Sequence, residues 1–287
     1  MKKILSLILI LCSCSFLFGC NDASSAPVIA TTKPVYCFAS ALCEGTALEV
    51  ELLVSENVSC LHDYTLQVSQ MQKIENAELI IINGAGFEEF LSDVLPADKP
   101  VLDSSEGIDL LCGDDHHEEE HHHEGDPHIW LSITNAKQMA QNIASGLIAR
   151  YPQYASKIAE NHDSLLEKFN RLELLAQELD ALPHRDLITF HDGFSYLAEA
   201  FDLHILKAIE EESGSEASAQ ELIQIIQDIK EHNIPAIFTE VSGATSAADI
   251  IHGEANVKVY ALDMALSELD YFEAMEYNIK TLKEALK

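Results

Sequence analysis

From residue 28 onward, short apolar strand-like segments alternate with longer segments whose apolar residues recur at helical spacing. In the first half of the chain, strands are predicted at Val28–Thr32, Leu48–Val54, Glu78–Ile82 and Val101–Leu102, and helices at Val35–Cys43, Tyr64–Asn76, Phe87–Leu91 and Asn135–Ile148. Strands that alternate with helices predict a parallel sheet that is covered by helices on both faces. The first half is therefore expected to form an α/β domain.

The segment Gln153–Leu182 keeps helical apolar spacing without a Gly or Pro residue. About thirty helical residues would span roughly 45 Å, which suits a rigid connector between two domains. The alternation then resumes, with strands predicted at Asp186–Phe190, His204–Ile209, Ala236–Val241 and Val257–Leu262, and helices at Phe194–Ala200, Ser218–His232, Ser246–Ala255 and Tyr271–Leu286. The predicted architecture is α/β: two (β/α) domains with parallel sheets, residues 28–151 and 183–287, joined by one long helix over residues 152–182.

The charge of the chain narrows the choice of partners. Its 287 residues include 48 Asp and Glu residues against 17 Lys and Arg residues, which gives a net charge of −31. Such a charge repels nucleic acid and anionic lipid headgroups, so neither is an expected partner surface. An acidic surface also concentrates cations, although solubility alone would explain it.

Residues 1–19 form a separate segment, in which two lysines precede an uncharged apolar run up to Phe18. This pattern predicts a secretion signal, because the run is too short and wrongly flanked for an ordinary membrane span. The sequence Leu17-Phe18-Gly19-Cys20 resembles the bacterial lipobox, which implies a lipid on Cys20. Residues 20–27 would then be a flexible tether. An uncleaved membrane anchor is the alternative.

Of the seven cysteines, two belong to the predicted signal and one is the predicted lipidation site. The remaining four are Cys37, Cys43, Cys60 and Cys112. Export to an oxidising compartment makes one or two disulfides plausible among them, and three connectivities stay open. A cysteine-based zinc site is less favoured because the chain has no C-x-x-C pair. Cys60, close to His62, stays open as a disulfide partner or a metal ligand.

Residues 113–126 contain no apolar residue, so we expect a mobile loop. Its histidines are His116, His117, His121, His122 and His123. The run His117–His121 matches the zinc-protease pattern H-E-x-x-H, but that mechanism requires both histidines on one face of a packed helix. We therefore interpret the match as a coincidence of composition. A low-affinity zinc-collecting loop and a solvated spacer both remain open.

Four side chains stand out because of where they follow predicted strands. His62 follows the second predicted strand of the first domain, and His128 precedes a predicted helix. His191 and Asp263 each come directly after a strand of the second domain. Ligands of parallel α/β sheets gather beyond the carboxyl ends of strands, so two residues from each domain can meet in the cleft. Three imidazoles and a carboxylate suit tetrahedral Zn²⁺, whereas Ca²⁺ and Mg²⁺ prefer oxygen ligands.

Two acids near these ligands have two interpretations. Glu240 ends a predicted strand, and Asp192 directly follows His191. Each could accept a hydrogen bond from a ligand imidazole, or be a solvated surface acid. The remaining histidines are expected to be surface or structural residues: His162, His184, His204, His232 and His252.

The segments around these residues resemble the metal-binding solute-binding lipoproteins of bacterial ABC importers, in the zinc/manganese group. The similar segments are His62–Tyr64, Asn83–Glu88, Asp126–Leu131, Phe190–Tyr196, Glu216–Ala219 and Leu262–Asp263. The resemblance implies two (β/α) domains joined by a rigid helix, with the metal between them. It also implies that His62, His128, His191 and Asp263 are the ligands.

The resemblance further implies a specific metal and role. Family members associated with manganese tend to have Glu at the third ligand position, so His191 implies zinc, and zinc members tend to carry a loop rich in histidine and acids. An extracytoplasmic protein is implied, lipid-anchored to the outer face of the cytoplasmic membrane, that delivers Zn²⁺ to an ABC permease. We expect a monomer without enzymatic activity. The alternatives are a manganese or broader transition-metal importer protein or adhesin, and a zinc-dependent hydrolase, which would need an open coordination position and a general base.

Overall fold

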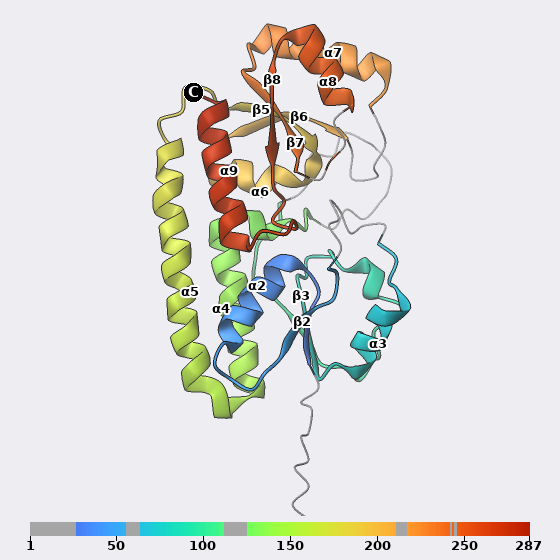
Figure 1. Cartoon of the computed structure of the whole chain (residues 1–287), viewed down its shortest axis with the longest axis vertical. Coiled ribbons are helices and arrows are strands. Elements are labelled where there is room, and N and C mark those ends of the chain that lie inside the picture. The colour runs from blue at the N-terminus through green and yellow to red at the C-terminus, as the bar shows by residue number, and fades with distance from the viewer. Residues whose placement is uncertain (1–26, 56–63, 112–124, 211–216, 242, 244–245) are drawn as a thin grey trace, which may run out of the picture.

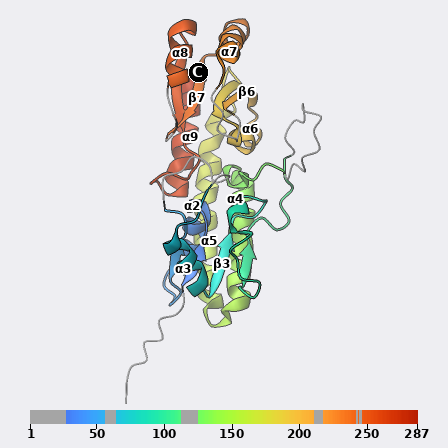
Figure 2. The same ribbon diagram turned by 90° about the vertical axis from the view of Figure 1, so that its right-hand side faces the viewer.

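The computed structural model describes residues 27–55, 64–111, 125–210, 217–241, 243 and 246–287. Within this part of the chain, the strands form two four-stranded parallel sheets. The two sheets lie one above the other along the long axis of the molecule (Figures 1 and 2). The predicted α/β class with two parallel sheets is confirmed.

The first sheet has the strand order β2-β1-β3-β4. Its strands are β1 (Val28–Ala30), β2 (Val50–Leu52), β3 (Leu79–Ile82) and β4 (Val101–Asp103). The central strands β1 and β3 contain only apolar residues, as expected where helices cover both faces of a parallel sheet. The edge strands β2 and β4 each carry an acid, Glu51 or Asp103, and are more exposed.

The helices of the first half are α2 (Lys33–Cys43), α3 (Val68–Asn76) and α4 (Ile133–Arg150), with short 3₁₀ turns η1 (Glu89–Leu91) and η2 (Ile129–Leu131). Helix α4 begins at an N-cap, where Ser132 Oγ accepts a hydrogen bond from the backbone N–H of Asn135. Because His128 directly precedes η2, this cap fixes the chain just beyond a predicted ligand.

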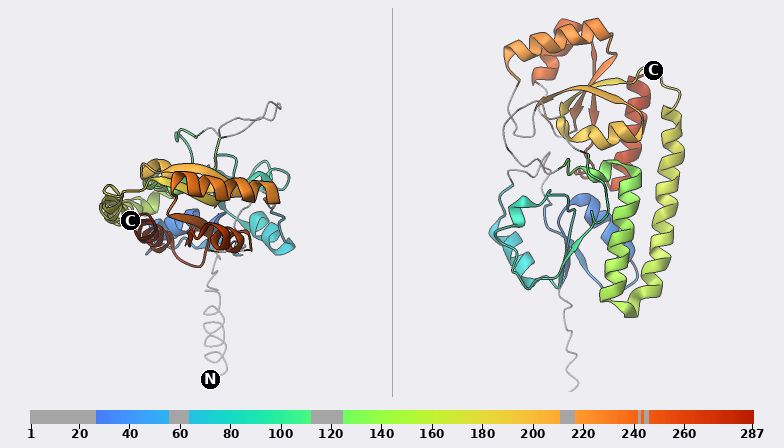
Figure 3. Two further views of the ribbon diagram at one scale, coloured as in Figure 1. Left: turned by 90° about the horizontal axis from the view of Figure 1, so that it is seen from above. Right: turned by 180° about the vertical axis from the view of Figure 1, so that it is seen from behind.

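The second sheet has the strand order β6-β5-β7-β8. Its strands are β5 (Asp186–His191), β6 (His204–Glu210), β7 (Ala236–Glu240) and β8 (Lys258–Leu262). Its helices are α6 (Ser195–Ala200), α7 (Ala219–His232), α8 (Ser246–Ala255) and α9 (Tyr271–Ala285), with the 3₁₀ turn η5 (Asp192–Phe194). Helices α7 and α8 pack together at the end of the molecule far from the first sheet (Figures 1 and 3).

The two faces of the second sheet belong to different cores, because successive strand residues point to opposite faces. Ile188 and Ile237 face a small core that is shared with α7 and α8. Leu187 and Phe238 belong to the large core, which also contains the first sheet. The large core is therefore continuous through both halves of the molecule.

Helix α5 (Ala155–Ala176), extended by the 3₁₀ turn η4 (Gln177–Leu179), runs past both halves (Figures 1 and 3). It packs against α2 and α4 of the first half and α9 of the second. The ring of Phe169 lies 5.5 Å from that of Phe38 in α2 and 5.0 Å from that of Phe272 in α9, measured between centres. These aromatic contacts bury the connector against both halves, which favours a rigid connection.

Most predicted elements are present with shifted ends, and the differences have local causes. The predicted helix over Tyr64–Asn76 begins only at Val68, where Gln67 and Gln70 form a reciprocal cap. The connector helix is shorter than predicted, because Pro152–Tyr154 forms a separate 3₁₀ turn. Its 22 residues span about 33 Å.

Of the one or two disulfides that the sequence allows among the four remaining cysteines, the structure leaves at most one. Cys37 and Cys43 are both free thiols on α2. Burial raises the pKa of Cys43 to about 12, so this thiol stays protonated and is a poor metal ligand. A single disulfide between Cys60 and Cys112 stays a prediction, since both lie outside the described residues.

The predicted signal and lipidation site also lie outside the described residues, which begin at residue 27. Of the helices in the described part, none combines the length and apolar character that a membrane span requires.

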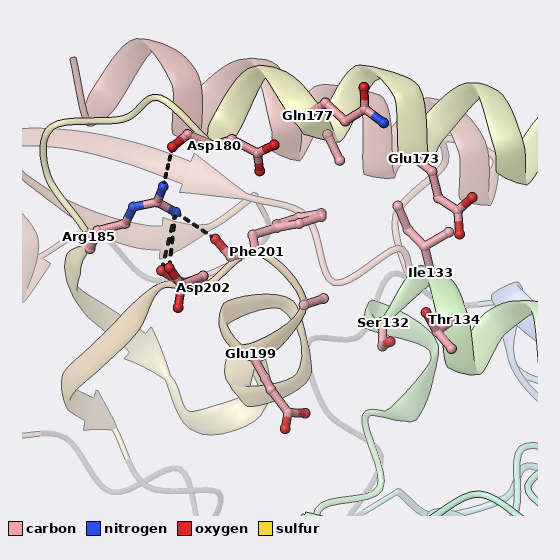
Figure 4. A pocket seen from close by; sticks show the side chains of 12 residues that line it. Ser132, Ile133, Thr134, Glu173, Gln177, Asp180, Arg185, Glu199, Phe201 and Asp202 are labelled. Carbon is pink, nitrogen blue, oxygen red and sulfur yellow. Dashed lines mark hydrogen bonds and ion pairs between the residues drawn. The ribbon is translucent and has the colours of Figure 1, made fainter.

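A groove of about 540 Å³ lies where the turn after α5 meets α6 and the start of α4 (Figure 4). Arg185 lies at this groove, and its Nη1 donates to the carbonyl oxygens of Phe201 (2.9 Å) and Asp202 (3.3 Å). Its Nη2 donates to the carbonyl oxygen of Asp180 at 2.7 Å. One guanidinium therefore joins the end of the connector to the turn between α6 and β6.

We expect Arg185→Ala to lower the free energy of unfolding by about 1–3 kcal/mol, because three carbonyl oxygens lose a charged donor. Urea denaturation of the metal-free protein measures this change. Arg171→Ala is the matched control, since it removes the same charge from an exposed position on α5 and should cost less than about 0.5 kcal/mol. Equal losses of unfolding free energy in the Arg185→Ala and Arg171→Ala variants would contradict the role assigned to Arg185.

Candidate metal centre

Two of the predicted ligands meet between the two sheets. His128 and His191 are 0% and 8% exposed, and their ring centres lie 5.5 Å apart at an interplanar angle of 88°. His128 precedes η2 of the first half, whereas His191 is the last residue of β5. The structure thus brings one imidazole from each half together.

The other two predicted ligands are not part of this pair in the described structure. His62 lies outside the described residues. Asp263 follows β8 directly and is 2% exposed. Within the described ranges, no three His, Cys, Asp or Glu side chains are grouped closely enough to hold a metal ion by themselves. The described centre is therefore an imidazole pair with carboxylates around it.

Asp126 sets the orientation of the His128 ring. Its Oδ1 accepts a hydrogen bond from the backbone N–H of His128 at 2.9 Å and lies 2.8 Å from Nδ1 of the same residue. A proton on Nδ1 then points at the carboxylate, which leaves the lone pair on Nε2 for a metal. The rings of Phe87 and Trp130 pack against the imidazole, with centres 5.6 Å and 5.3 Å away. His128 is therefore held by a carboxylate and two aromatic rings.

Glu240 has the corresponding place beside His191. Its Oε1 lies 3.5 Å from His191 Nδ1, and both side chains are buried. Because β7 lies between β5 and β8, Glu240 also lies at the carboxyl edge between His191 and Asp263. This geometry supports the interpretation of Glu240 as an acceptor for a ligand imidazole. Asp192 is exposed, so its two interpretations remain open.

Gly193 leaves room for the His191 ring. A Cβ atom at this position would lie 2.7 Å from His191 Cδ2 and 2.9 Å from its Nε2. Any side chain here would therefore displace the nitrogen that faces away from Glu240. The glycine in the sequence His191-Asp192-Gly193 is needed for close packing beside the imidazole.

Asp263 is anchored on both its backbone and its carboxylate. The side chain of Asn278 in α9 bonds to the N–H and the C=O of Asp263, each at 2.7 Å. The carboxylate accepts from the backbone N–H of Ala265 (2.8 Å) and from Ser267 Oγ (2.5 Å). These donors orient both oxygens, and each oxygen keeps a further lone pair that could face a metal.

Glu88 supports the centre from the first sheet. Its Oε1 accepts from Thr31 Oγ1 (2.5 Å) and the backbone N–H of Asn83 (2.6 Å), and its Oε2 accepts from the N–H of Gly84 (3.1 Å). Asn83 Nδ2 in turn donates to the carbonyl oxygen of Pro127 at 3.1 Å. Glu88 therefore holds the turn after β3 that braces the residue before His128.

Sequence reasoning gave neither Asp126 nor Glu88 a role. The signal for Asp126 was available in the spacing Asp-Pro-His, because a carboxylate two residues before a ligand can reach its ring. Glu88 closes a local turn through Asn83 and Gly84, but its side-chain partner Thr31 is distant in the chain. The mobile loop expected over residues 113–126 does not extend to Asp126, because its side chain is only 11% exposed and its backbone N–H and C=O are both hydrogen-bonded. The five loop histidines lie outside the described residues.

The family model for zinc-uptake complex component A, periplasmic, matches residues 28–285. The zinc-binding lipoprotein AdcA of Streptococcus pneumoniae serotype 4 is 30% identical, and the match covers 99% of this chain but 61% of AdcA. The high-affinity zinc uptake system protein ZnuA of Haemophilus ducreyi is 30% identical, over 86% of this chain and 87% of the relative. A solved structure of a ZnuA deletion mutant with zinc bound is similar at a TM-score of 0.80 and 29% identity, covering 92% of this chain and 98% of the other. This chain therefore spans about three fifths of the length of AdcA, 61% of which is matched.

Glu88 makes a pH-dependent contribution to stability. Burial raises its pKa from 4.5 to about 7, the hydrogen bonds to the carboxylate oppose this shift, and the nearby Asp103 carboxylate adds to it. Because the pKa is higher in the folded state, the stabilisation is fully present below pH 4.5 and is lost as the pH rises through about 7.

We therefore expect Glu88→Gln, which cannot ionise, to become more stable relative to the parent as the pH rises from 5 to 8, by up to about 3 kcal/mol. Urea denaturation at several pH values, with a chelator present to remove metal, measures both proteins. If the free energies of unfolding of the parent and the variant change in parallel with pH, this result would contradict the raised pKa of Glu88.

Proposed function

The chain belongs to the family of periplasmic zinc-uptake complex component A proteins, and on this premise we propose that it captures Zn²⁺ outside the cytoplasm and delivers the ion to a membrane permease. Proteins of this family are solute-binding components of ABC importers and not enzymes. The hydrolase alternative therefore carries no further weight.

The observation that carries the proposal is the buried pair of imidazoles. Two imidazoles bound to one tetrahedral zinc through Zn–N bonds of about 2.0–2.1 Å would have ring centres roughly 5 Å apart. The centres of His128 and His191 lie 5.5 Å apart, so the pair needs little movement to share one ion. Asp126 and Glu240 beside the two Nδ1 atoms leave both Nε2 atoms for the metal.

We assign His62, His128, His191 and Asp263 as the ligands of this zinc. His62 is included on the sequence resemblance alone. Asp263 is included because a buried, oriented carboxylate at the same sheet edge as His191 can complete a tetrahedral set. Nitrogen ligands at the described pair favour zinc over manganese, which prefers carboxylate oxygen.

Two further features belong to the proposal. A lipid on Cys20 and a tether over residues 20–27 would keep the protein at the outer face of the membrane, close to its permease. The histidines of residues 113–124 would collect zinc weakly. The acidic chain, with its net charge of −31, would raise the local concentration of the cation.

The continuous core limits how this protein can open and close. Helix α5 packs against helices of both halves, so a hinge between the halves would have to break buried aromatic contacts. We therefore propose that zinc binding and release need only a small tilt or a loop movement.

Changing His62, His128 and His191 together to Ala should weaken zinc binding by more than about 100-fold, beyond the effect typical of outer residues. Zinc is titrated into metal-stripped protein against a competing chelator. The single tryptophan, Trp130, has its ring centre 5.3 Å from that of His128, so its fluorescence reports binding at this centre.

The matched control changes His184, His204 and His232 to Ala. This control also removes three imidazoles, but from positions away from the pair, and it should bind zinc as the parent does. Tight binding by the first triple variant would show that the ligand assignment is wrong.

The loop is tested by deleting residues 113–124, which keeps Asp126 beside His128. We expect this deletion to preserve one tight zinc site and to lose only weaker additional binding. The same deletion with Asp126→Asn should bind zinc about 10–100-fold less tightly, because His128 loses its orienting carboxylate. Isothermal titration with chelator competition measures both affinity and stoichiometry. Loss of the tight site on deletion alone would instead identify the loop as the main site.

A further inference from the structure

The hydroxyl group of Tyr196 joins the two halves of the molecule next to the metal centre. Tyr196 lies in α6 of the second half and is 1% exposed. Its hydroxyl accepts a hydrogen bond from the backbone N–H of Leu111 at 2.9 Å and donates to the carbonyl oxygen of Asp126 at 3.0 Å. Both partners belong to the first half by sequence. The 3₁₀ turn that follows His128 also packs against α6.

Leu111 and Asp126 are also bonded directly to each other. The backbone N–H of Asp126 donates to the carbonyl oxygen of Leu111 at 2.8 Å. Gly125 permits this close approach, because a Cβ atom there would lie 2.6 Å from Leu110 Cβ and 2.8 Å from the carbonyl oxygen of Leu111. We call Leu111, Asp126 and Tyr196 the clamp. It closes the two ends of the segment that contains the histidine-rich residues.

Asp126 connects the clamp to the metal centre. Its N–H and its C=O are both used within the clamp, and its carboxylate is used by His128. Because both backbone groups are bonded, the backbone that carries this carboxylate is held in place beside His128. Loss of the Tyr196 bond would free the carbonyl of Asp126 and loosen the carboxylate that orients His128.

The clamp also relates the two imidazoles to each other. Tyr196 follows His191 by one short turn of chain, through η5 and the start of α6. The path from His191 to His128 therefore runs through one short piece of chain and two hydrogen-bonded contacts. The hydroxyl of Tyr196 is the point at which this path crosses between the halves.

We propose that Tyr196 is a positioning residue for zinc binding, which acts through Asp126 to hold the His128 imidazole at its place opposite His191. This inference rests on the proposed function only in taking His128 as a zinc ligand. It adds that a hydroxyl bonded to the backbone of Leu111 and Asp126 determines how well the pair binds the ion. It also links Leu111 to the geometry of the centre.

The test is Tyr196→Phe in the full-length chain, which removes the hydroxyl and keeps the buried ring. We expect zinc affinity, measured by chelator competition, to fall about 10-fold, at the low end of the range for residues that orient ligands. The d–d absorption spectrum of the Co²⁺-substituted protein should also change, because the direction of the His128 ligand changes. Tyr151→Phe is the matched control, a buried tyrosine hydroxyl at the far end of α4, and should alter neither quantity.

A double-mutant cycle shows whether Tyr196 acts through Asp126. Asp126→Asn should weaken zinc binding by itself, and adding Tyr196→Phe to it should cost clearly less than 10-fold. Circular dichroism confirms that each variant is folded at the temperature of the titration. Additive losses, or a Tyr196→Phe protein with the affinity and Co²⁺ spectrum of the parent, would overturn the inference.

These outcomes separate this inference from the proposed function. If the parent binds zinc tightly and loses it on removal of the three ligand histidines, the proposed function holds whatever Tyr196→Phe does. If the parent binds no zinc tightly, the proposed function fails first. In that case the parent and the Tyr196→Phe variant are compared at saturating Co²⁺. Their absorption spectra still report whether the clamp orients His128, and identical spectra would overturn the inference.

Discussion

The segment Asp126–Leu131 is hydrogen-bonded to both halves of the molecule, and the geometry of the metal centre depends on these bonds. From the first half, Asn83 donates to the carbonyl oxygen of Pro127. From the second half, Tyr196 donates to Asp126, and Tyr271 donates to the carbonyl oxygen of Trp130 at 2.9 Å. Trp130 Nε1 also donates to the carbonyl oxygen of Met264 at 2.7 Å. Nearly all of these groups are buried, so breaking any one would leave an unsatisfied polar group at a cost of about 1–3 kcal/mol.

The same arrangement explains why the two halves behave as one body around the centre. A continuous hydrophobic core runs from the first sheet through α2, α4, α5 and α9 to one face of the second sheet. Buried aromatic side chains at the middle of this core pack in edge-on contacts, as between Phe38 and Tyr271 with ring centres 4.8 Å apart. A binding protein built in this way is preorganised for its ion, and preorganisation lowers the cost of ordering the site when the ion binds.

The chemistry of the centre follows from pairing each imidazole with a carboxylate. Asp126 lies beside Nδ1 of His128 and Glu240 beside Nδ1 of His191, so the same ring nitrogen is paired with a carboxylate in both residues. A carboxylate behind an imidazole also raises its basicity and hence its strength as a ligand. The two halves therefore contribute imidazoles that are paired alike in different sequence contexts: with an Asp two residues earlier in one case, and with a Glu on the neighbouring strand in the other.

Local pattern was enough to predict much of this protein. The order of strands and helices, the two parallel sheets, and the places of His191 at the end of β5 and Asp263 directly after β8 all follow from periodicity and strand ends, which depend on residues near one another in sequence. Tertiary structure alone decided that Asp126 belongs to the packed structure rather than to the polar segment before it, that Glu240 lies beside His191, and that the core is continuous. The contact between Tyr196 and Asp126 joins residues 70 positions apart, and Thr31 and Glu88 are 57 apart. Such contacts are set by how whole elements pack, because hydrogen bonds between distant residues form only where packing brings their atoms within reach, and no local spacing encodes that approach.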